Sequence, residues 1–206
     1  MIIAGLTGGL ACGKSFVAAA LQDLGCHVIE ADELGHEVLR PDGEAYAAVI
    51  AQFGPEILDD QGSIDRPKLA ARVFGDPAAL ERLNAIVHPA VQQRAGRQFH
   101  EIGERDPRAI VIYVAAILIE SGGYKKCDKL IVVSCTRAQQ IERAMHRHDA
   151  NMHDAALADV LARLERQMPM EKKLEFADYV IDTTGTKADT LRQTKMVFED
   201  LRTLES

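Results

Sequence analysis

The chain has 206 residues, of which 47% are apolar and 27% charged, the balance of an ordinary globular protein. Its formal net charge of −7 argues against binding to nucleic acid, because proteins that bind phosphate backbones are usually basic. No stretch approaches the ~18 uninterrupted apolar residues of a membrane-spanning helix. We therefore expect one domain with insertions and no membrane or nucleic-acid partner.

The first predicted element is a strand, a loop and a helix centred on residues 8–15, GGLACGKS. These residues fit the pattern G-x-x-x-x-G-K-[ST] without a mismatch, and the apolar residues 1–6 predict a buried strand before them. Apolar residues then recur at helical spacing, at Val17, Ala20, Leu21 and Leu24. Glycines let backbone N–H groups converge on phosphate oxygens at a helix N-terminus. The pattern predicts a nucleoside triphosphate site, and the alternative is a glycine turn without a ligand.

Each residue type in this loop has a predicted role. Lys14 is expected to reach the β- and γ-phosphates, and the Ser15 hydroxyl is expected to coordinate Mg²⁺. The other predicted contacts to the triphosphate come from the loop and the first helical turn: Gly8, Gly9, Leu10, Ala11, Cys12, Gly13 and Phe16. Because residues 1–6 already predict a strand with no basic segment before it, we expect no signal peptide.

An acidic residue, Asp32, follows the predicted second strand, residues 26–29. Ligands of open α/β sheets bind beyond the carboxyl ends of the strands, so Asp32 is expected to face the same crevice as the loop. A carboxylate there can accept the proton of an attacking hydroxyl or help to hold the metal. The alternative is that Asp32 only caps a helix.

Residues 33–108 contain little that predicts a strand. Residues 46–53 are expected to be helical, and Asp76 with Pro77 supplies a cap and a first-turn proline for another helix. We expect Pro89 to interrupt that helix. The segment therefore predicts a mostly helical insertion, placed where it could form a substrate site.

Three further strands are predicted at residues 109–116, 129–134 and 179–181. Glu120 follows the first of these, where an acidic side chain could enter the site. The alternative is that Glu120 is a solvated loop residue.

A helical pair is predicted between the fourth and fifth strands, with Arg143 and Arg147 on one helix face. We expect this pair to be a lid that closes its arginines onto the phosphates. The alternative is an exposed helix that carries ordinary surface arginines.

The order of these elements predicts an α/β fold of the P-loop type, a parallel five-stranded sheet flanked by helices. Within a single domain of residues 1–206, the nucleotide-binding core is expected in residues 1–32, 109–136 and 177–206. The helical insertion is expected at residues 33–108 and the lid at residues 137–176.

Two absences from the sequence narrow the class of nucleotide protein. The predicted third strand ends in Ala115 and Ala116, where a conventional Walker B motif has an aspartate, and no Asn-Lys-x-Asp motif for guanine recognition occurs. A small chain with a helical insertion and an arginine-bearing lid favours a kinase of small molecules over a nucleotide-dependent switch protein. A switch would release only the nucleoside diphosphate, whereas a kinase would also phosphorylate an added acceptor.

The cysteines indicate the compartment. Cys12, Cys26, Cys127 and Cys135 form no C-x-x-C pair and no spacing typical of a metal site. Scattered cysteines of this kind predict reduced thiols in a cytoplasmic protein rather than disulfides.

The sequence resembles the dephospho-coenzyme A kinases over nearly its whole length and in the family's order. The resemblance begins with residues 5–15 and continues with residues 30–32, which end in Ala-Asp. Its further motifs are residues 62–66 with Leu69 and Phe74, residues 86–89 ending in His-Pro, residues 118–120, Arg143 with Arg147, Gln167, and residues 177–182 before Gly185. The Ala-Asp and His-Pro elements are far more specific than the glycine loop alone.

The resemblance implies that the γ-phosphate of ATP, with Mg²⁺, is transferred to the ribose 3′-hydroxyl of dephospho-coenzyme A, the last step of coenzyme A synthesis. It implies that Asp32 is the catalytic base and that Lys14, Arg143 and Arg147 act on the transferred phosphate. The residues that it implies for acceptor binding are Thr7, Asp32, Arg66, His88 and Glu120. The alternative is a related kinase of another nucleotide or small metabolite.

Three positions depart from the family's usual pattern. Glu30 stands where the family usually has aspartate, and Ala116 stands where it usually has proline. Thr183 and Thr184 stand where an asparagine commonly follows the last strand.

Overall fold

A computed structural model describes residues 1–146 and 153–204. The chain divides into two compact units. The first consists of Met1–Ile29 and Ile102–Ser206, and the second of Glu30–Glu101. Asp32, which the sequence placed in the nucleotide-binding core, therefore belongs to the second unit.

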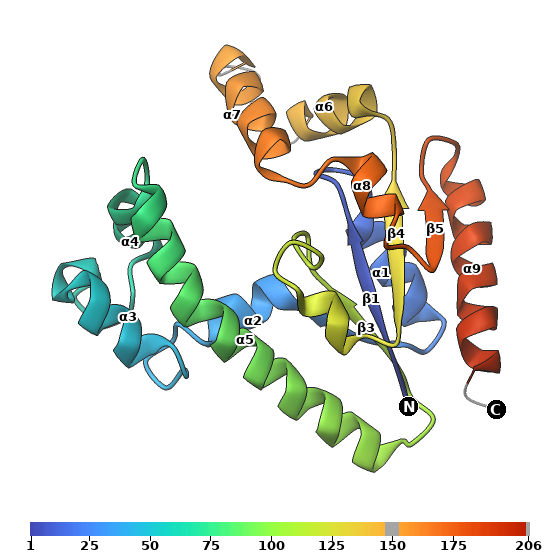
Figure 1. The fold of residues 1–206 in the computed structure, drawn as a ribbon, viewed down its shortest axis with the longest axis horizontal. Coiled ribbons are helices and arrows are strands. Elements are labelled where there is room, and N and C mark those ends of the chain that lie inside the picture. Colours follow the sequence, from blue (N-terminus) through green and yellow to red (C-terminus); the bar gives the residue numbers. More distant parts are fainter. Residues whose placement is uncertain (147–152, 205–206) are drawn as a thin grey trace. The chain divides into compact units, whose positions relative to one another are not determined.

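A five-stranded sheet in the order β2-β3-β1-β4-β5 forms the centre of the first unit (Figure 1). β1 pairs in parallel with β3 and β4, and β4 pairs in parallel with β5. The strands are β1 (Ile2–Gly8), β2 (His27–Glu30), β3 (Ile110–Val114), β4 (Lys129–Ser134) and β5 (Tyr179–Asp182). The fold class predicted from the sequence is confirmed, and so are the bounds of the fourth strand.

Helices enclose this sheet because its strands are apolar on both faces. Ile112 and Ile131 are completely buried, and they share one hydrophobic core with Val17, Leu21 and Leu201 of the flanking helices. Helices α1 and α9 contact each other, and α9 also lies along β5 (Figure 1). The helices of this unit are α1 (Lys14–Asp23), η2 (Gly123–Lys126), α6 (Arg137–Met145), α7 (His153–Arg166), α8 (Met170–Leu174) and α9 (Lys187–Thr203).

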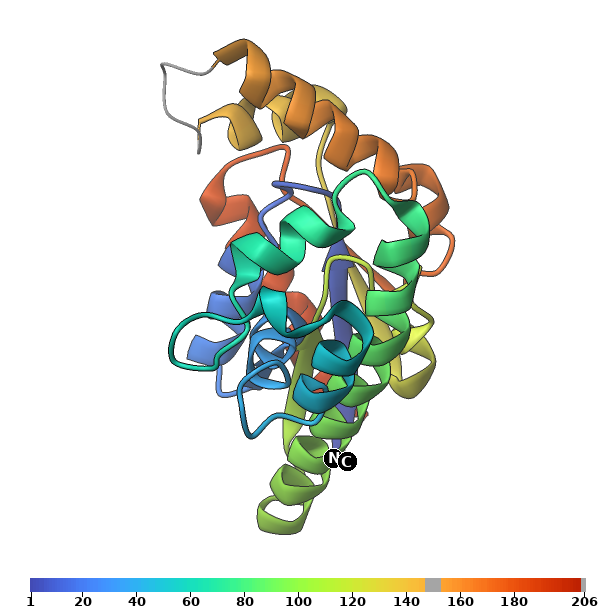
Figure 2. The same ribbon diagram turned by 90° about the vertical axis from the view of Figure 1, so that its left-hand side faces the viewer.

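Helices α6 and α7 lie side by side beyond the carboxyl ends of β1 and β4, as both views of the ribbon show (Figures 1 and 2). This is the segment for which the sequence predicted a helical lid. Thr136 caps α6 through a reciprocal pair of hydrogen bonds with Gln139, which fixes where the helix begins after β4. Because the chain leaves β4 directly into α6, the first residues of this helix lie at the same edge of the sheet as the glycine loop after β1.

The second unit is mostly helical, as the sequence predicted. Its small core contains Leu34, Val49, Phe53, Ile57 and Leu69. Its elements are α2 (Ala31–Glu37), α3 (Tyr46–Phe53), η1 (Pro55–Ile57), α4 (Arg66–Val73) and most of α5 (Pro77–Arg105), which continues into the first unit. The guanidinium of Arg94 pairs with Glu37 at 2.8 Å and with Glu44 at 3.2 Å, which connects α5 to the last residue of α2 and to the segment after it.

The expected interruption at Pro89 is wrong, because α5 is one continuous helix with Pro89 inside it. A proline in a helix removes one backbone hydrogen bond and costs ~3 kcal/mol or more. The turns after Pro89 bury Ala90, Val91, Ala95 and Phe99. Burial of these side chains offsets the cost, which the local sequence does not reveal. The expected cap is confirmed, since the Ala79 N–H donates to the Asp76 carboxylate at 3.0 Å.

Over residues 1–146 and 153–204, no helix is long and apolar enough to cross a membrane.

Candidate active site

The glycine loop joins the carboxyl end of β1 to the N-terminus of α1. A Cβ atom on Gly8 would lie 2.3 Å from the carbonyl oxygen of Val133 in β4, so only glycine fits where the loop leaves the sheet. Gly13, the N-cap of α1, has a φ of 89°, which also favours glycine. The loop backbone therefore takes the curled path that the sequence pattern predicted.

Lys14 is the first residue of α1, and its ammonium group lies over the loop. Its Nζ donates to the carbonyl oxygens of Gly8 at 3.1 Å and Gly9 at 2.9 Å. Ser15, the next residue, is exposed at the start of the helix. A positive charge, exposed hydroxyl and helix N-terminus in one turn can hold an anion such as a triphosphate. The predicted contacts of Lys14 and Ser15 with a nucleotide stay predictions.

Two glutamines from the lid segment contact the glycine loop. Gln140 of α6 donates through Nε2 to the Cys12 sulfur at 3.3 Å. The side-chain oxygen of Gln167, just after α7, accepts a hydrogen bond from the Leu10 N–H at 2.9 Å. In addition, Ala11 packs in a small apolar cluster with Ala144 of α6 and Val160 of α7. A movement of the lid helices would therefore change these contacts with the glycine loop directly. Nothing in the sequence indicated the role of Gln140.

Thr183, in the turn after β5, connects the loop to the lid. It is only 6% exposed, and its hydroxyl lies 2.9 Å from the Cys12 carbonyl oxygen and 3.1 Å from that of Ser134. Arg143 of α6 donates to this hydroxyl at 2.9 Å and to the Thr183 carbonyl oxygen at 2.7 Å. Arg143 is therefore not an ordinary surface arginine. Arg147 lies outside the described residues.

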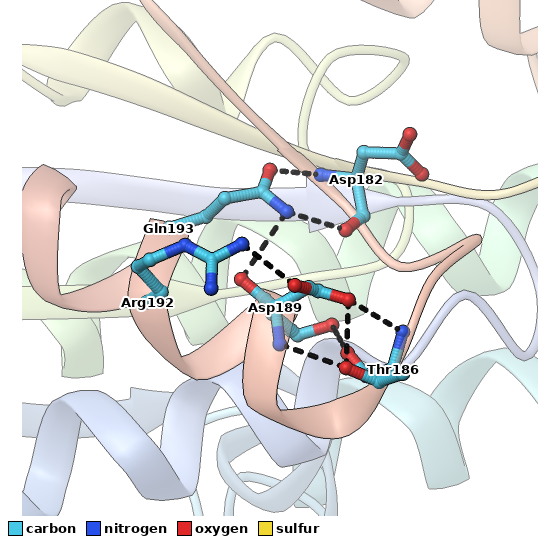
Figure 3. Close-up of polar contacts among 6 residues, drawn as sticks. Asp182, Thr186, Asp189, Arg192 and Gln193 are labelled. Carbon is cyan, nitrogen blue, oxygen red and sulfur yellow. Dashed lines mark hydrogen bonds and ion pairs between the residues drawn. The ribbon is translucent and has the colours of Figure 1, made fainter.

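Hydrogen bonds at the start of α9 fix the turn that carries Thr183 (Figure 3). Thr186 is the N-cap of α9 and forms a reciprocal capping box with Asp189. Hydrogen bonds from the Thr186 hydroxyl and N–H lower the pKa of the Asp189 carboxyl. The Gln193 side-chain amide forms two hydrogen bonds with the backbone of Asp182. It donates to the Asp182 carbonyl oxygen at 2.9 Å and accepts from the Asp182 N–H at 2.9 Å. The turn is thus anchored on both sides of Thr183.

Glu120 is paired with Lys173 of α8, which is completely buried. The two charged groups are 2.8 Å apart, and Glu120 also accepts from the Met168 N–H at 3.0 Å. Glu120 thus lies in a turn and is partly exposed, but its carboxylate is held by an ion pair and a backbone hydrogen bond. Its contact with the acceptor stays a prediction. Burial raises the pKa of the Glu120 carboxyl, but the hydrogen bonds from Lys173 and Met168 outweigh it and hold the pKa below the usual value. The burial of Lys173 was not predicted, since a lysine in a short charged segment is expected to be exposed.

A contact to the acceptor was also predicted for Thr7, which is completely buried near this ion pair. Its hydroxyl donates to the Ala116 carbonyl oxygen at 3.3 Å, and Lys173 Nζ donates to the same oxygen at 2.9 Å. In this conformation the Thr7 hydroxyl faces protein rather than solvent. Its contact with the acceptor stays a prediction.

The ion pair leads to a prediction about stability. We expect Glu120→Ala to lower the free energy of unfolding by ~3–5 kcal/mol, because it leaves a buried ammonium group without its counter-charge. Lys173→Met should cost less, because methionine fills the buried volume and the Glu120 side chain, 22% exposed, can turn towards water. The double variant should recover most of the loss. Urea denaturation of all four proteins measures this, and an equal loss from either single change would contradict it.

The contribution of the Glu120–Lys173 pair to stability depends on pH, and the direction follows from the lowered pKa of Glu120. The folded pKa of Glu120 lies below its usual 4.5, so the stabilisation is fully present above about pH 4.5. It is lost as the pH falls through the lower, folded pKa. The Glu120→Ala variant should therefore lack this part of the acid-induced loss of stability.

The other predicted site residues lie in the second unit. Asp32 is an exposed residue in the first turn of α2, and the N-cap of this helix is Glu30. The alternative that Asp32 caps the helix is therefore wrong, because β2 runs through Glu30 and the helix begins at the next residue. Burial raises the pKa of Glu30, and the carboxylates of Glu33 and Asp32 raise it further.

Arg66 and His88 are the two remaining residues predicted to bind the acceptor. Arg66 is exposed at the start of α4, where the Asp65 carboxylate caps the helix through the Lys68 N–H. His88 lies within α5, and burial lowers its pKa, which favours the neutral imidazole. In the part of the chain that the structure describes, no three His, Cys, Asp or Glu side chains gather as a metal site.

A family model described as dephospho-CoA kinase matches residues 2–189. The chain belongs to the dephospho-CoA kinase family. A curated dephospho-CoA kinase from Aquifex aeolicus is 40% identical over 197 residues, which are 96% of each chain. The crystal structure of TT1252 from Thermus thermophilus is 32% identical with a TM-score of 0.77, over 97% of each chain. A dephospho-CoA kinase from Campylobacter jejuni, 21% identical over 97% of this chain and 96% of its own, has the same fold with a TM-score of 0.63.

Two positions at which this member of the dephospho-CoA kinase family departs from the usual pattern have clear structural roles. The carbonyl oxygen of Ala116 accepts hydrogen bonds from Thr7 and Lys173. A proline would present the same oxygen, so the exchange leaves these contacts intact. Thr183 uses its hydroxyl to connect Arg143 with the glycine loop.

Proposed function

We propose that this chain uses ATP to phosphorylate the ribose 3′-hydroxyl of dephospho-coenzyme A and so produces coenzyme A. The observation that carries this proposal is membership of the dephospho-CoA kinase family over residues 2–189, combined with a correctly formed glycine loop and Lys14 at its end. Phosphoryl transfer needs positioning and charge neutralisation more than covalent chemistry by the protein. The loop, Lys14 and Arg143 are suited to these two tasks.

ATP binding would rearrange the contacts around the loop. The ammonium of Lys14 now bonds to the Gly8 and Gly9 carbonyl oxygens, which are weaker partners than phosphate oxygens. Arg143 now bonds to Thr183, so it would have to leave that turn in order to reach a phosphate. We infer that nucleotide binding exchanges both sets of contacts for contacts to the phosphates. Arg147 is proposed as the second lid arginine.

The acceptor side of the proposal depends on residues of the second unit. Asp32 would accept the proton of the 3′-hydroxyl, and its carboxylate is exposed and so accessible to an acceptor. Arg66 and His88 would contact the acceptor, Arg66 as a cation for its phosphates. Thr7 and Glu120 complete the proposed acceptor residues, although the Glu120 carboxylate is at present engaged by Lys173.

Mg²⁺ is proposed as the metal cofactor. Mg²⁺ prefers oxygen ligands and keeps several waters, so it needs few protein donors beyond the phosphates. The exposed Ser15 hydroxyl, next to Lys14, is a suitable donor. Bound there, Mg²⁺ would neutralise charge on the β- and γ-phosphates. We place the protein in the cytoplasm, since its four cysteines are free thiols.

A coupled assay of ADP release, with and without dephospho-coenzyme A, tests the proposed function. We expect ADP release to depend on the acceptor, and mass spectrometry should show an acceptor heavier by one phosphoryl group. Acceptor-independent release of ADP would instead favour a nucleotide switch. Release that depends on another nucleotide or small metabolite, but not on dephospho-coenzyme A, would favour the related-kinase alternative.

A further inference from the structure

Two cysteines from distant parts of the sequence meet at the glycine loop. Cys12 lies within the loop, and Cys135 is the first residue after β4. Their sulfur atoms are 3.0 Å apart, with the Cys135 thiol donating to the Cys12 sulfur. A disulfide bond is about 2.04 Å long, so a closure of ~1 Å would allow the bond to form. The kinase chemistry proposed above uses neither sulfur.

The surroundings of the pair favour a negative charge on Cys12. The Cys135 thiol donates to the Cys12 sulfur, Gln140 Nε2 donates to it at 3.3 Å, and the ammonium of Lys14 is close by. The hydrogen bond from Cys135 is the largest effect, and together these groups outweigh burial and lower the pKa of Cys12 to about 7. The same hydrogen bond raises the pKa of Cys135, which therefore keeps its proton. At neutral pH a substantial fraction of Cys12 is therefore a thiolate beside the Cys135 thiol.

The other two cysteines lack this environment. Burial raises the pKa of Cys26 to about 12, and burial together with the Asp128 carboxylate raises the pKa of Cys127 to about 12. Both are therefore thiols at neutral pH and react slowly with oxidants. They serve as internal references for the reactivity of the pair.

A cavity gives small molecules a route to the pair. Its volume is about 330 Å³, and Cys135, Gly9, Gln140 and Gln167 are among its lining residues. The Cys12 sulfur is itself buried, but its two hydrogen-bond donors, Cys135 and Gln140, both line this cavity. A molecule of the size of hydrogen peroxide fits such a space, whereas a bulky reagent does not reach the sulfur atoms without a movement of the lid segment.

We propose that Cys12 and Cys135 form an oxidation site for hydroperoxides, and that their disulfide disables the phosphate-binding loop. The Cys12 thiolate attacks one peroxide oxygen and the O–O bond breaks, which gives a sulfenic acid on Cys12 and releases hydroxide. The Cys135 thiol then displaces the sulfenic oxygen as water and forms the S–S bond. The two sulfurs are oxidised by two electrons in total, and the peroxide is reduced.

The disulfide should impair nucleotide binding because Cys12 belongs to the loop that would hold the phosphates. Closure to bonding distance draws Cys12 towards the end of β4. It also removes the thiolate that accepts from Gln140 and shifts the backbone carbonyl oxygen that Thr183 contacts. Misplacement of a substrate-positioning group by about 1 Å can cost ~10²-fold in rate. This consequence rests on the proposed function, whereas the formation of the disulfide does not.

The experiment treats the reduced full-length protein with hydrogen peroxide and maps disulfides by peptide mass spectrometry. We expect a Cys12–Cys135 cross-link, unmodified Cys26 and Cys127, and a fall of ~10²-fold in turnover that dithiothreitol reverses. Binding of ATP, measured by calorimetry on reduced and oxidised protein, should weaken in parallel. The cross-link and the ATP binding can be read even if dephospho-coenzyme A is not the acceptor.

Two variants sharpen this test. Cys135→Ser keeps a hydroxyl donor towards Cys12 and should retain basal turnover. After peroxide it should form no cross-link, and unfolding of the treated protein in the presence of dimedone should trap the sulfenic acid on Cys12. The matched control Cys127→Ser should still form the Cys12–Cys135 disulfide. Absence of this cross-link from the peroxide-treated wild type would overturn the proposal, as would a complete cross-link that leaves both turnover and ATP binding unchanged.

Discussion

Lys14→Ala should abolish turnover while the protein remains folded. The side chain is half-buried, and its ammonium donates to the carbonyl oxygens of Gly8 and Gly9. Lys14 is not part of the hydrophobic core around the sheet, so its removal should leave that core intact. With nucleotide bound, no other side chain of the loop could supply a positive charge between the β- and γ-phosphates. Loss of one preorganised charged donor costs ~10²–10³-fold in kcat, and we expect a loss at or beyond the upper end of this range.

The matched control for Lys14 is Lys195→Ala, which removes an exposed lysine from the outer part of α9. Its ion pair with Glu199 is long, at 3.9 Å, and exposed, so both activity and stability should be close to wild type. Circular dichroism and thermal melting establish that each variant is folded, and the ADP-release assay gives kcat. Near-parental activity in folded Lys14→Ala protein would remove the basis for a phosphate site at this loop.

Asp32→Asn should lower kcat by ~10²–10⁴-fold, the usual contribution of a positioned general base. Asparagine has the same size but cannot accept the proton of the 3′-hydroxyl. ATP and dephospho-coenzyme A should still bind, because the glycine loop and Lys14 are unchanged. The cost in stability should be small. A carboxylate in the first turn of a helix contributes only ~0.3–1 kcal/mol, and removal of this one also relieves repulsion with Glu30.

The structure supplies a sharp control for this experiment in Glu33→Gln. Glu33 is the next residue, is also an exposed acid in the first turn of α2, and also raises the pKa of Glu30. Any effect of helix charge should therefore appear in both variants, whereas loss of the base should appear only in Asp32→Asn. A rise in KM with kcat preserved would mean that Asp32 only positions the acceptor. Wild-type kinetics in Asp32→Asn would contradict any role in the reaction.

Local patterns in the sequence were sufficient for the glycine loop and for most elements around it. Glycines at fixed spacing, a Lys-Ser pair at the start of a helix and apolar strands are signals carried by residues close together in the chain. The fourth strand, Lys129–Ser134, and the third helix, Tyr46–Phe53, have the bounds that the sequence predicted. A short, dense apolar run strongly favours a buried strand, and apolar residues at regular helical spacing strongly favour a helix.

The same local signals failed where packing decided the outcome. Pro89 predicted a break, yet α5 continues through it because the following turns bury four side chains. Asp32 suited a helix cap, yet β2 extends through Glu30 and the helix begins at once, so Asp32 lies in the first turn. At Pro89 the preference of one residue is worth about 3 kcal/mol and is outweighed by the burial of the side chains that follow.

The sequence by itself determined the kind of fold, the phosphate-binding loop and the family. Only the tertiary structure decided what surrounds that loop. The Cys12–Cys135 pair joins residues 123 positions apart, and the contact of Thr183 with Cys12 joins residues 171 positions apart. The ion pair of the buried Lys173 with Glu120 joins residues 53 positions apart. These contacts arise because the sheet places β1 between β3 and β4, so the segments that follow each strand meet at one edge. Strand order depends on the packing of the whole chain, and no short stretch of sequence encodes it.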